Sequence, residues 1–212
     1  MSQLRFSGWP PEAFEWFDQL EANNNREWFH EHRATYDSDV RSPLESLLAE
    51  VVDEFGEGVV SRPNRDTRFS KDKTPYRLDI YARITRESGG GYYVRLHPDG
   101  MFVGGGIYRP DRDRLARLRA AIADDRTGPQ LERIVERLQG AGADLMRQDR
   151  LKSAPRGYAV DHPRIDLLRL RNLAGGTEFP IRKWIHTREA AERIIAGWRA
   201  VTPLMEWAAS NC

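Results

Sequence analysis

The clearest pattern in this chain is a strict alternation of apolar and polar residues over positions 78–85. Leu78, Ile80, Ala82 and Ile84 alternate with Asp79, Tyr81, Arg83 and Thr85. Successive side chains of a β-strand point to opposite faces of the sheet, so this spacing predicts a strand with one buried face. Its other face would carry the ionisable groups.

A hairpin is predicted directly after this strand. Two apolar runs, 92–97 and 101–108, flank the tripeptide Pro98-Asp99-Gly100, whose residues favour a tight turn. A further short strand is expected at 67–69. Together these segments predict a mostly antiparallel sheet over about residues 66–108.

Apolar residues recur at helical spacing on both sides of this region. The segments are 14–20, 44–55, 115–122, 131–138 and 191–201. Ser42 before Pro43 predicts a capped helix start, and Thr127 predicts another. Pro203 should bend or end the last helix, because proline lacks the backbone N–H that a helix interior needs.

The segment from 140 to 180 gives a weaker pattern. We expect a short strand near Leu145, a helical turn after Pro163, and a loop or strand around 172–179. A chain of 212 residues without repeats or linkers fits one compact domain. The prediction is a single globular domain, 1–212, of the α+β class, with N-terminal, middle and C-terminal helices packed on the sheet.

The charge balance restricts the partners. Lys and Arg number 33 against 32 Asp and Glu, for a net charge of +1. Such a chain has no global field to draw it onto nucleic acid or membrane, so we predict neither partner, and any electrostatic function must be local.

The single cysteine, Cys212, cannot close an intrachain disulfide, which suits the cytoplasm. No run of about 18 apolar residues and no signal peptide is evident. The sequence specifies no oligomeric state.

The most polar stretch is 64–77, which reads NRDTRFSKDKTPYR. Its candidate ligand residues are Arg65, Arg68, Lys71, Lys73 and Tyr76. Guanidinium and ammonium groups could clamp a phosphate or a carboxylate. Alternatively, the two aspartates of the stretch pair with these cations and order the loop. If the stretch is a strand, Phe69 would face the core and Arg68 the ligand.

Gly104-Gly105-Gly106 interrupts a predicted strand, where glycine destabilises unless a bulge or a close approach requires it. Gly105 is therefore a candidate for contact with a ligand, and a bulge that curves the sheet is the alternative. No phosphate-binding loop follows from it, since neither the required Lys nor a helix start comes next.

A second polar concentration lies around Tyr158. It contributes the candidate ligand residues Lys152 and Arg156, together with Asp161 and His162. Asp161 or His162 could cap the helical turn that Pro163 begins. The alternative is a general acid or base at His162.

No metal site or cofactor is predicted. His30 and His32 lie two positions apart, so on a helix they point to nearly opposite sides, unlike the four-residue spacing of helical zinc ligands.

Several motifs resemble those of the domain-of-unknown-function family 2461 (DUF2461). They are Asn24-Asn25-Arg26-Glu27-Trp28-Phe29, the block from Asp66 to Tyr76, Gly91-Tyr92-Tyr93, Gly104 to Pro110, Pro155-Arg156-Gly157-Tyr158 and Asp161-His162-Pro163. The likeness runs in order from about Phe6 to Leu170. It implies a single globular α/β unit in the cytosol and suggests that the polar motifs matter jointly. It implies no activity, substrate or catalytic residue.

Three functions remain open. The leading hypothesis is that the cations and Tyr76 converge near Gly105 on a small anionic ligand, such as a phosphorylated metabolite. The second is a non-catalytic protein-interaction or structural module with Tyr81, Tyr92, Tyr93 and Phe102 on an exposed sheet face. The third is a hydrolase or lyase that uses His162 and Asp161, with Lys71 as electrophile.

Overall fold

The computed structural model describes residues 5–212 and divides into two compact units. The first unit contains the chain as far as Thr85 together with residues 93–103 and 178–195. The second contains residues 86–92, 104–177 and 196–212. The single domain predicted for the whole chain stays a prediction.

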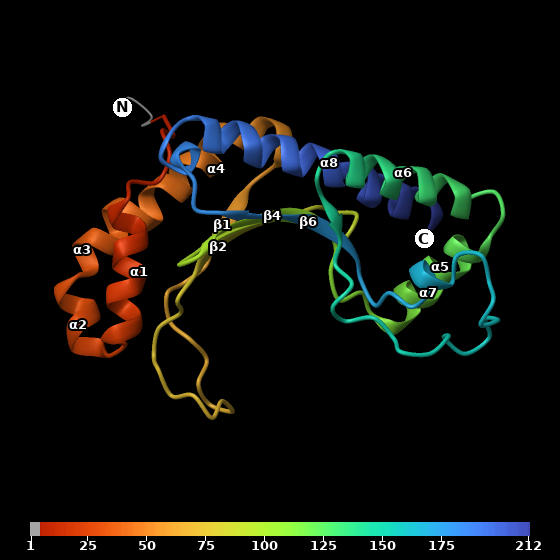
Figure 1. Ribbon diagram of the computed structural model, residues 1–212, viewed down its shortest axis with the longest axis horizontal. Helices are drawn as coiled ribbons and strands as arrows, with labels where there is room; N and C mark the ends of the chain where they lie inside the picture. The colour runs from red at the N-terminus through yellow and green to blue at the C-terminus, as the bar shows by residue number, and fades with distance from the viewer. Residues whose placement is uncertain (1–4) are drawn as a thin grey trace. The chain divides into compact units, whose positions relative to one another are not determined.

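The N-terminal helices of the first unit are α1 (Glu12–Ala22), α2 (Arg26–Glu31), a helical turn α3 (Arg33–Thr35), the π-helix η1 (Tyr36–Arg41) and α4 (Ser42–Phe55) (Figure 1). Asn25 caps α2, since its side-chain oxygen accepts a hydrogen bond from the N–H of Trp28. In η1 the carbonyl of Val40 accepts a hydrogen bond from the indole of buried Trp9 at 3.2 Å. Ser42 does not cap α4, because the chain enters that helix directly from η1.

The strands are β1 (Gly58–Val60), β2 (Ile80–Thr85), β3 (Gly91–His97), β4 (Gly100–Ile107), β5 (Asp144–Leu145) and β6 (Leu173–Pro180). They form one antiparallel sheet in the order β1-β2-β3-β4-β6-β5. The hairpin and the strands near Leu145 and 172–179 are confirmed. The fold is α+β, as predicted.

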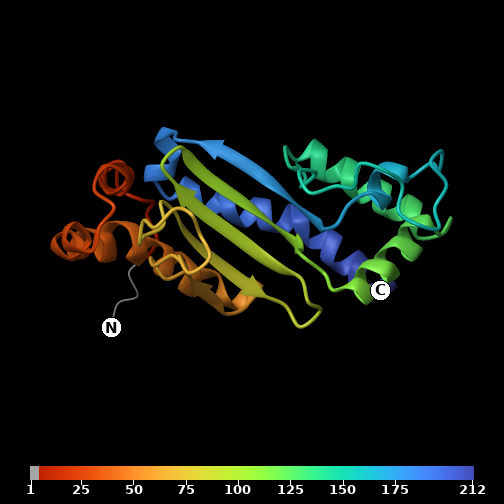
Figure 2. The same cartoon turned by 90° about the horizontal axis from the view of Figure 1, so that it is seen from below.

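The alternation in β2 is also confirmed. Ile80, Ala82 and Ile84 are buried, whereas Tyr81 is only half-buried and Arg83 is exposed. In the first unit α4 lies over the buried side, and the methyl groups of Leu48 leave no room for a side chain at Gly58 (Figure 1). The other side of β2, β3 and β4 has no helix of the first unit in front of it (Figure 2).

The remaining helices are α5 (Arg112–Ala123), α6 (Gly128–Gly140), α7 (Ile165–Leu168), the 3-10 turn η2 (Lys183–His186) and α8 (Glu189–Asn211). α7 is the predicted helical turn after Pro163. Pro203 does not end α8, which continues to Asn211. Thr127 precedes α6, but its hydroxyl donates to the carbonyl of Ala121 rather than capping α6.

The predicted strand at 67–69 is wrong. Asn64 and Tyr76 form an isolated antiparallel bridge, and the residues between them make an irregular loop that projects from the sheet on the side away from α4 (Figure 1). Phe69 is 97% exposed, so it is no core anchor. The bridge closes the loop several residues before Phe69, and the ring therefore lies beyond reach of the core.

Candidate functional site

The loop between Asn64 and Tyr76, here the signature loop, is ordered by its own charges. The guanidinium of Arg65 bonds to the carboxylate of Asp72 and the hydroxyl of Thr74. Asp72 also accepts from the N–H and the hydroxyl of Thr74, at 2.9 and 2.8 Å. The hydrogen bond from Arg65, followed by those from Thr74, lowers the pKa of Asp72 to about 2.

A second pair lies nearer the tip of the signature loop. Arg68 donates from two nitrogens to the two oxygens of Asp66, at 3.0 and 2.7 Å. Hydrogen bonds from the Arg68 side chain, then from its backbone N–H, hold the pKa of Asp66 below its usual value. Lys73 donates to the carbonyl of Thr67 at 2.9 Å, and Lys71 is exposed. The carboxylates of the loop thus occupy two of the guanidinium groups expected to bind a ligand.

Tyr76 anchors the base of the signature loop. It is buried, and its ring stacks on that of Phe29 with centroids 3.9 Å apart and an interplanar angle of 11°. The side chain of Asn24 binds both backbone groups of Tyr76. Two of the motifs behind the family resemblance therefore meet in space, and their contact fixes the loop to the N-terminal helices.

Gly105 lies in the second unit, where its missing side chain allows close packing. A Cβ atom there would lie 2.6 Å from the carbonyl oxygen of Gly91 and 3.0 Å from a methyl of Val201 on α8. Gly106 has φ +130°, and a Cβ would meet the carbonyl of Leu173 at 2.4 Å. Backbone packing accounts for both glycines.

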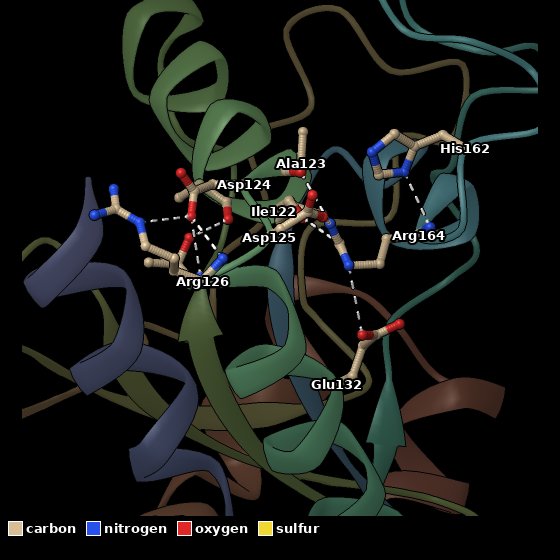
Figure 3. Close-up of polar contacts among 10 residues, drawn as sticks. Ile122, Ala123, Asp124, Asp125, Arg126, Glu132, His162 and Arg164 are labelled. Atoms are coloured by element: carbon tan, nitrogen blue, oxygen red, sulfur yellow. Dashed lines mark hydrogen bonds and ion pairs between the residues drawn. The ribbon is translucent and has the colours of Figure 1, made fainter.

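Lys152 and Arg156 are exposed and also belong to the second unit, as does His162. The nitrogen Nδ1 of His162 accepts the N–H of Arg164 at 3.0 Å, just before α7 (Figure 3). A backbone N–H can only donate, so Nδ1 supplies the lone pair and Nε2 carries the proton. In this tautomer His162 has no free lone pair with which to act as a base. Asp161 is exposed.

Arg164 is the buried charge of this region, and sequence reasoning missed it. Its guanidinium donates to the last carbonyls of α5, at 2.7 Å for Ile122 and 2.9 Å for Ala123 (Figure 3). It also bonds to Asp125 at 2.7 Å and lies 3.9 Å from Glu132. The residue is only 7% exposed. A cation at these carbonyls stabilises the C-terminus of α5, so this cluster joins α5, α6 and the segment before α7.

The side of β2, β3 and β4 that has no helix of the first unit in front of it carries a row of aromatic rings from these three strands. The ring centroids of Tyr81 and Tyr93 are 5.3 Å apart, and those of Tyr93 and Phe102 are 6.1 Å apart. All three side chains are half-buried. We call the side chains of Tyr81, Tyr93 and Phe102, with Arg95 and His97, the open face.

Tyr92 is not part of this face, which corrects the expectation for it. It is buried, its ring centroid is 5.7 Å from that of Trp198, and its hydroxyl lies 2.9 Å from that of Thr202. The reason is strand geometry: Tyr92 and Tyr93 are consecutive, so they must point to opposite sides.

One arginine, Arg77, lies beside the open face, and another, Arg95, lies on it. The guanidinium of Arg77 lies 5.1 Å from the ring centroid of Tyr81 and is held by Asp79 through two hydrogen bonds, at 2.6 and 3.0 Å. The guanidinium of Arg95 lies 3.8 Å from Glu178. The carboxylate of Glu178 lies closer to His97, with its Oε1 in hydrogen-bond contact with Nε2 at 2.5 Å. Burial, and then the charge of Asp79, raises the pKa of Tyr93 to about 12, so this hydroxyl keeps its proton to a higher pH than an exposed tyrosine does.

The sequence alone is sufficient to place Arg95 and His97 on the same face of β3 as Tyr93, because alternate residues of a strand point to the same side. Glu178 could not have been found, because it lies 81 positions from His97.

Among residues 5–212, no group of three or more His, Cys, Asp and Glu side chains is placed to hold a metal. No helix in this described part is long and apolar enough to cross a membrane. A cavity of about 10 Å³ in the second unit, lined by Leu118, Arg119 and Leu170 among others, has room for one water molecule.

A family model described as "Conserved hypothetical protein (DUF2461)" matches residues 12–207, so the chain belongs to that family. The match includes most of α8, beyond the range from Phe6 to Leu170 that the motifs indicate. No curated protein and no solved structure matches the chain.

Proposed function

We propose that this protein is a non-catalytic binding protein whose open face holds an acidic segment of another protein. The observation that carries the proposal is the row formed by Tyr81, Tyr93 and Phe102, with Arg77 and Arg95 beside it. Aromatic rings and arginines are the side chains most enriched where proteins bind one another. Arg95 supplies the positive charge that an acidic segment would meet, since Arg77 is paired with Asp79.

The layout favours an extended partner over an enclosed small molecule. Small-molecule sites are concave and bury most of their ligand. The rings of the open face instead lie side by side across the neighbouring strands β2, β3 and β4. The net charge of +1 argues against a nucleic acid, which needs a broad basic surface. A cytoplasmic location is part of the proposal, because the one cysteine of the chain allows no internal disulfide.

A small anionic ligand is the second candidate, and Arg95 is the residue that favours it. Its buried Nε atom makes no hydrogen bond within residues 5–212, and the nearby carboxylate of Glu178 is engaged by His97. A phosphate or carboxylate could bind the exposed end of this guanidinium. In the signature loop, Lys71 and Lys73 would be the remaining cations, since Arg65 and Arg68 are paired.

The test is to titrate the 15N-labelled protein with three probes and to monitor its backbone amide shifts by NMR. The probes are a short peptide that alternates glutamate and leucine, inorganic phosphate, and oligothymidine. Amide shifts confined to β2, β3 and β4 with the peptide support the proposal. If phosphate shifts the amide of Arg95 and the peptide shifts no amide, the acidic-segment proposal is wrong and the small-ligand candidate takes its place. Tighter binding of oligothymidine, or no shift with any probe, overturns it.

A further inference from the structure

Phe69 is a solvent-exposed apolar side chain at the tip of the signature loop. It is 97% exposed, and a turn in which Ser70 N–H donates to the Thr67 carbonyl at 3.3 Å places it there. Isolated surface apolar residues are common, but a flexible chain can turn such a ring toward its own surface. Here the bonds of Arg65, Asp66 and Lys73 fix the loop and leave the ring outside.

The charge around this ring is positive. Between positions 65 and 73 the loop has four cationic side chains and two carboxylates. The carboxylates are engaged by Arg65 and Arg68, which leaves the positive charges of Lys71 and Lys73 uncompensated within the loop. The tip therefore presents one aromatic ring beside two ammonium groups.

We propose that the signature loop docks onto an anionic lipid surface, with Phe69 entering the interface and Lys71 and Lys73 meeting the headgroups. A projecting tip with a single apolar residue fits a plane that needs no matching pocket (Figure 1). A stable protein interface buries at least about 1,000 Å², far more than one loop tip offers. The near-zero net charge of the chain does not oppose this docking, because membrane attraction acts within about 10 Å and is set by local charge.

The docking is weak and reversible. One apolar side chain and two cations give an apparent dissociation constant of the order of millimolar lipid, comparable to that of proteins that need a second signal for stable anchoring. The inference is independent of the open face, since neither Phe69 nor the two lysines belong to it.

Co-sedimentation of the full chain with vesicles tests this inference. Vesicles that mix phosphatidylserine with phosphatidylcholine should retain the protein, and vesicles of phosphatidylcholine alone should not. Phe69→Ala should weaken the partition by about 10- to 100-fold, and Lys71→Gln by about 5-fold. Added salt should release the protein.

Matched controls separate the loop from general stickiness. Val160→Ala removes an apolar side chain that is 74% exposed in the second unit, and Lys152→Gln removes an exposed charge there. Both should bind vesicles as the wild type does, and all four variants should keep the wild-type melting temperature. Equal binding by Phe69→Ala and wild type, or no binding to anionic vesicles, overturns the inference. Complete competition by soluble glycerophosphoserine would also overturn it, since that result indicates a headgroup site instead of a surface.

Discussion

The side-chain amide of Asn24 forms hydrogen bonds with both backbone groups of Tyr76, each 3.0 Å long, across 52 positions of sequence. This contact joins the turn before α2 to the base of the signature loop. It brings two of the polar motifs into direct contact, one before α2 and one that ends at Tyr76.

Replacing Asn24 by Ala should destabilise the protein by about 1–3 kcal/mol, because two partly buried hydrogen bonds are lost. Urea denaturation measures this loss. Asn23→Ala is the matched control, since the Asn23 amide makes only an exposed bond to the carbonyl of Gln19, and it should cost less than about 0.5 kcal/mol. Equal unfolding midpoints for the two variants would contradict the account of the loop anchor.

Gly105→Ala should destabilise by about 1–3 kcal/mol, since the new methyl group would press on the Gly91 carbonyl and on Val201. Gly140→Ala, at the end of α6 with nothing within 4 Å of the added atom, should be neutral or stabilising by up to about 1 kcal/mol. Thermal unfolding compares them. If Gly105→Ala unfolds like the wild type and instead abolishes ligand binding, the packing role assigned here is wrong.

Arg164→Met should cost about 2–4 kcal/mol, because it leaves the carbonyls of Ile122 and Ala123 buried without their donor. Arg126→Met is the comparison, as that side chain is exposed, and its effect should stay within about 0.5 kcal/mol. Hydrogen exchange adds a local measurement: protection should fall first in the last turn of α5. Unchanged protection there would argue against the capping role.

Tyr36 predicts a specific alkaline sensitivity. Its hydroxyl is buried without a hydrogen bond of normal geometry among residues 5–212, and burial raises its pKa to about 12. The folded-state pKa lies above the unfolded value of about 10, so the folded chain retains the proton longer. Its contribution to stability is therefore complete below pH 10 and is lost as pH rises toward 12.

Tyr36→Phe should remove part of this alkaline decline, and at neutral pH it should be neutral or stabilising by up to about 1 kcal/mol. Denaturation midpoints at a series of alkaline pH values test both points. Tyr93→Phe should flatten the decline as well, because the pKa of Tyr93 is also raised to about 12. A decline that survives in the double variant would place its origin elsewhere.

Local patterns predicted most of the fold. The alternation in β2, the turn between β3 and β4 and the helical turn after Pro163 depend on neighbours in sequence, and each was predicted from them. The exposed position of Phe69 could not be predicted in this way. An alternating polar stretch has the same spacing in a strand as in a loop whose two ends pair with each other. Only the bridge between Asn64 and Tyr76 decides that the residues between them form a loop.

The site was less predictable than the fold. The alternation of side chains along β3 is by itself sufficient to place Tyr92 and Tyr93 on opposite sides of the sheet. The contacts of Glu178 with His97 and Arg95, and of Arg164 with α5, join segments far apart in sequence. No periodicity encodes such contacts.

The most direct test of the open face is the affinity of the alternating glutamate–leucine peptide for the wild type and two matched variants. Arg95→Gln removes the positive charge of the face, and Lys152→Gln removes an exposed charge in the other unit. Isothermal titration should show salt-dependent binding that Arg95→Gln weakens by about 5- to 30-fold and Lys152→Gln leaves unchanged. Binding that is absent in the wild type, or equal in the wild type and Arg95→Gln, would contradict the proposed function.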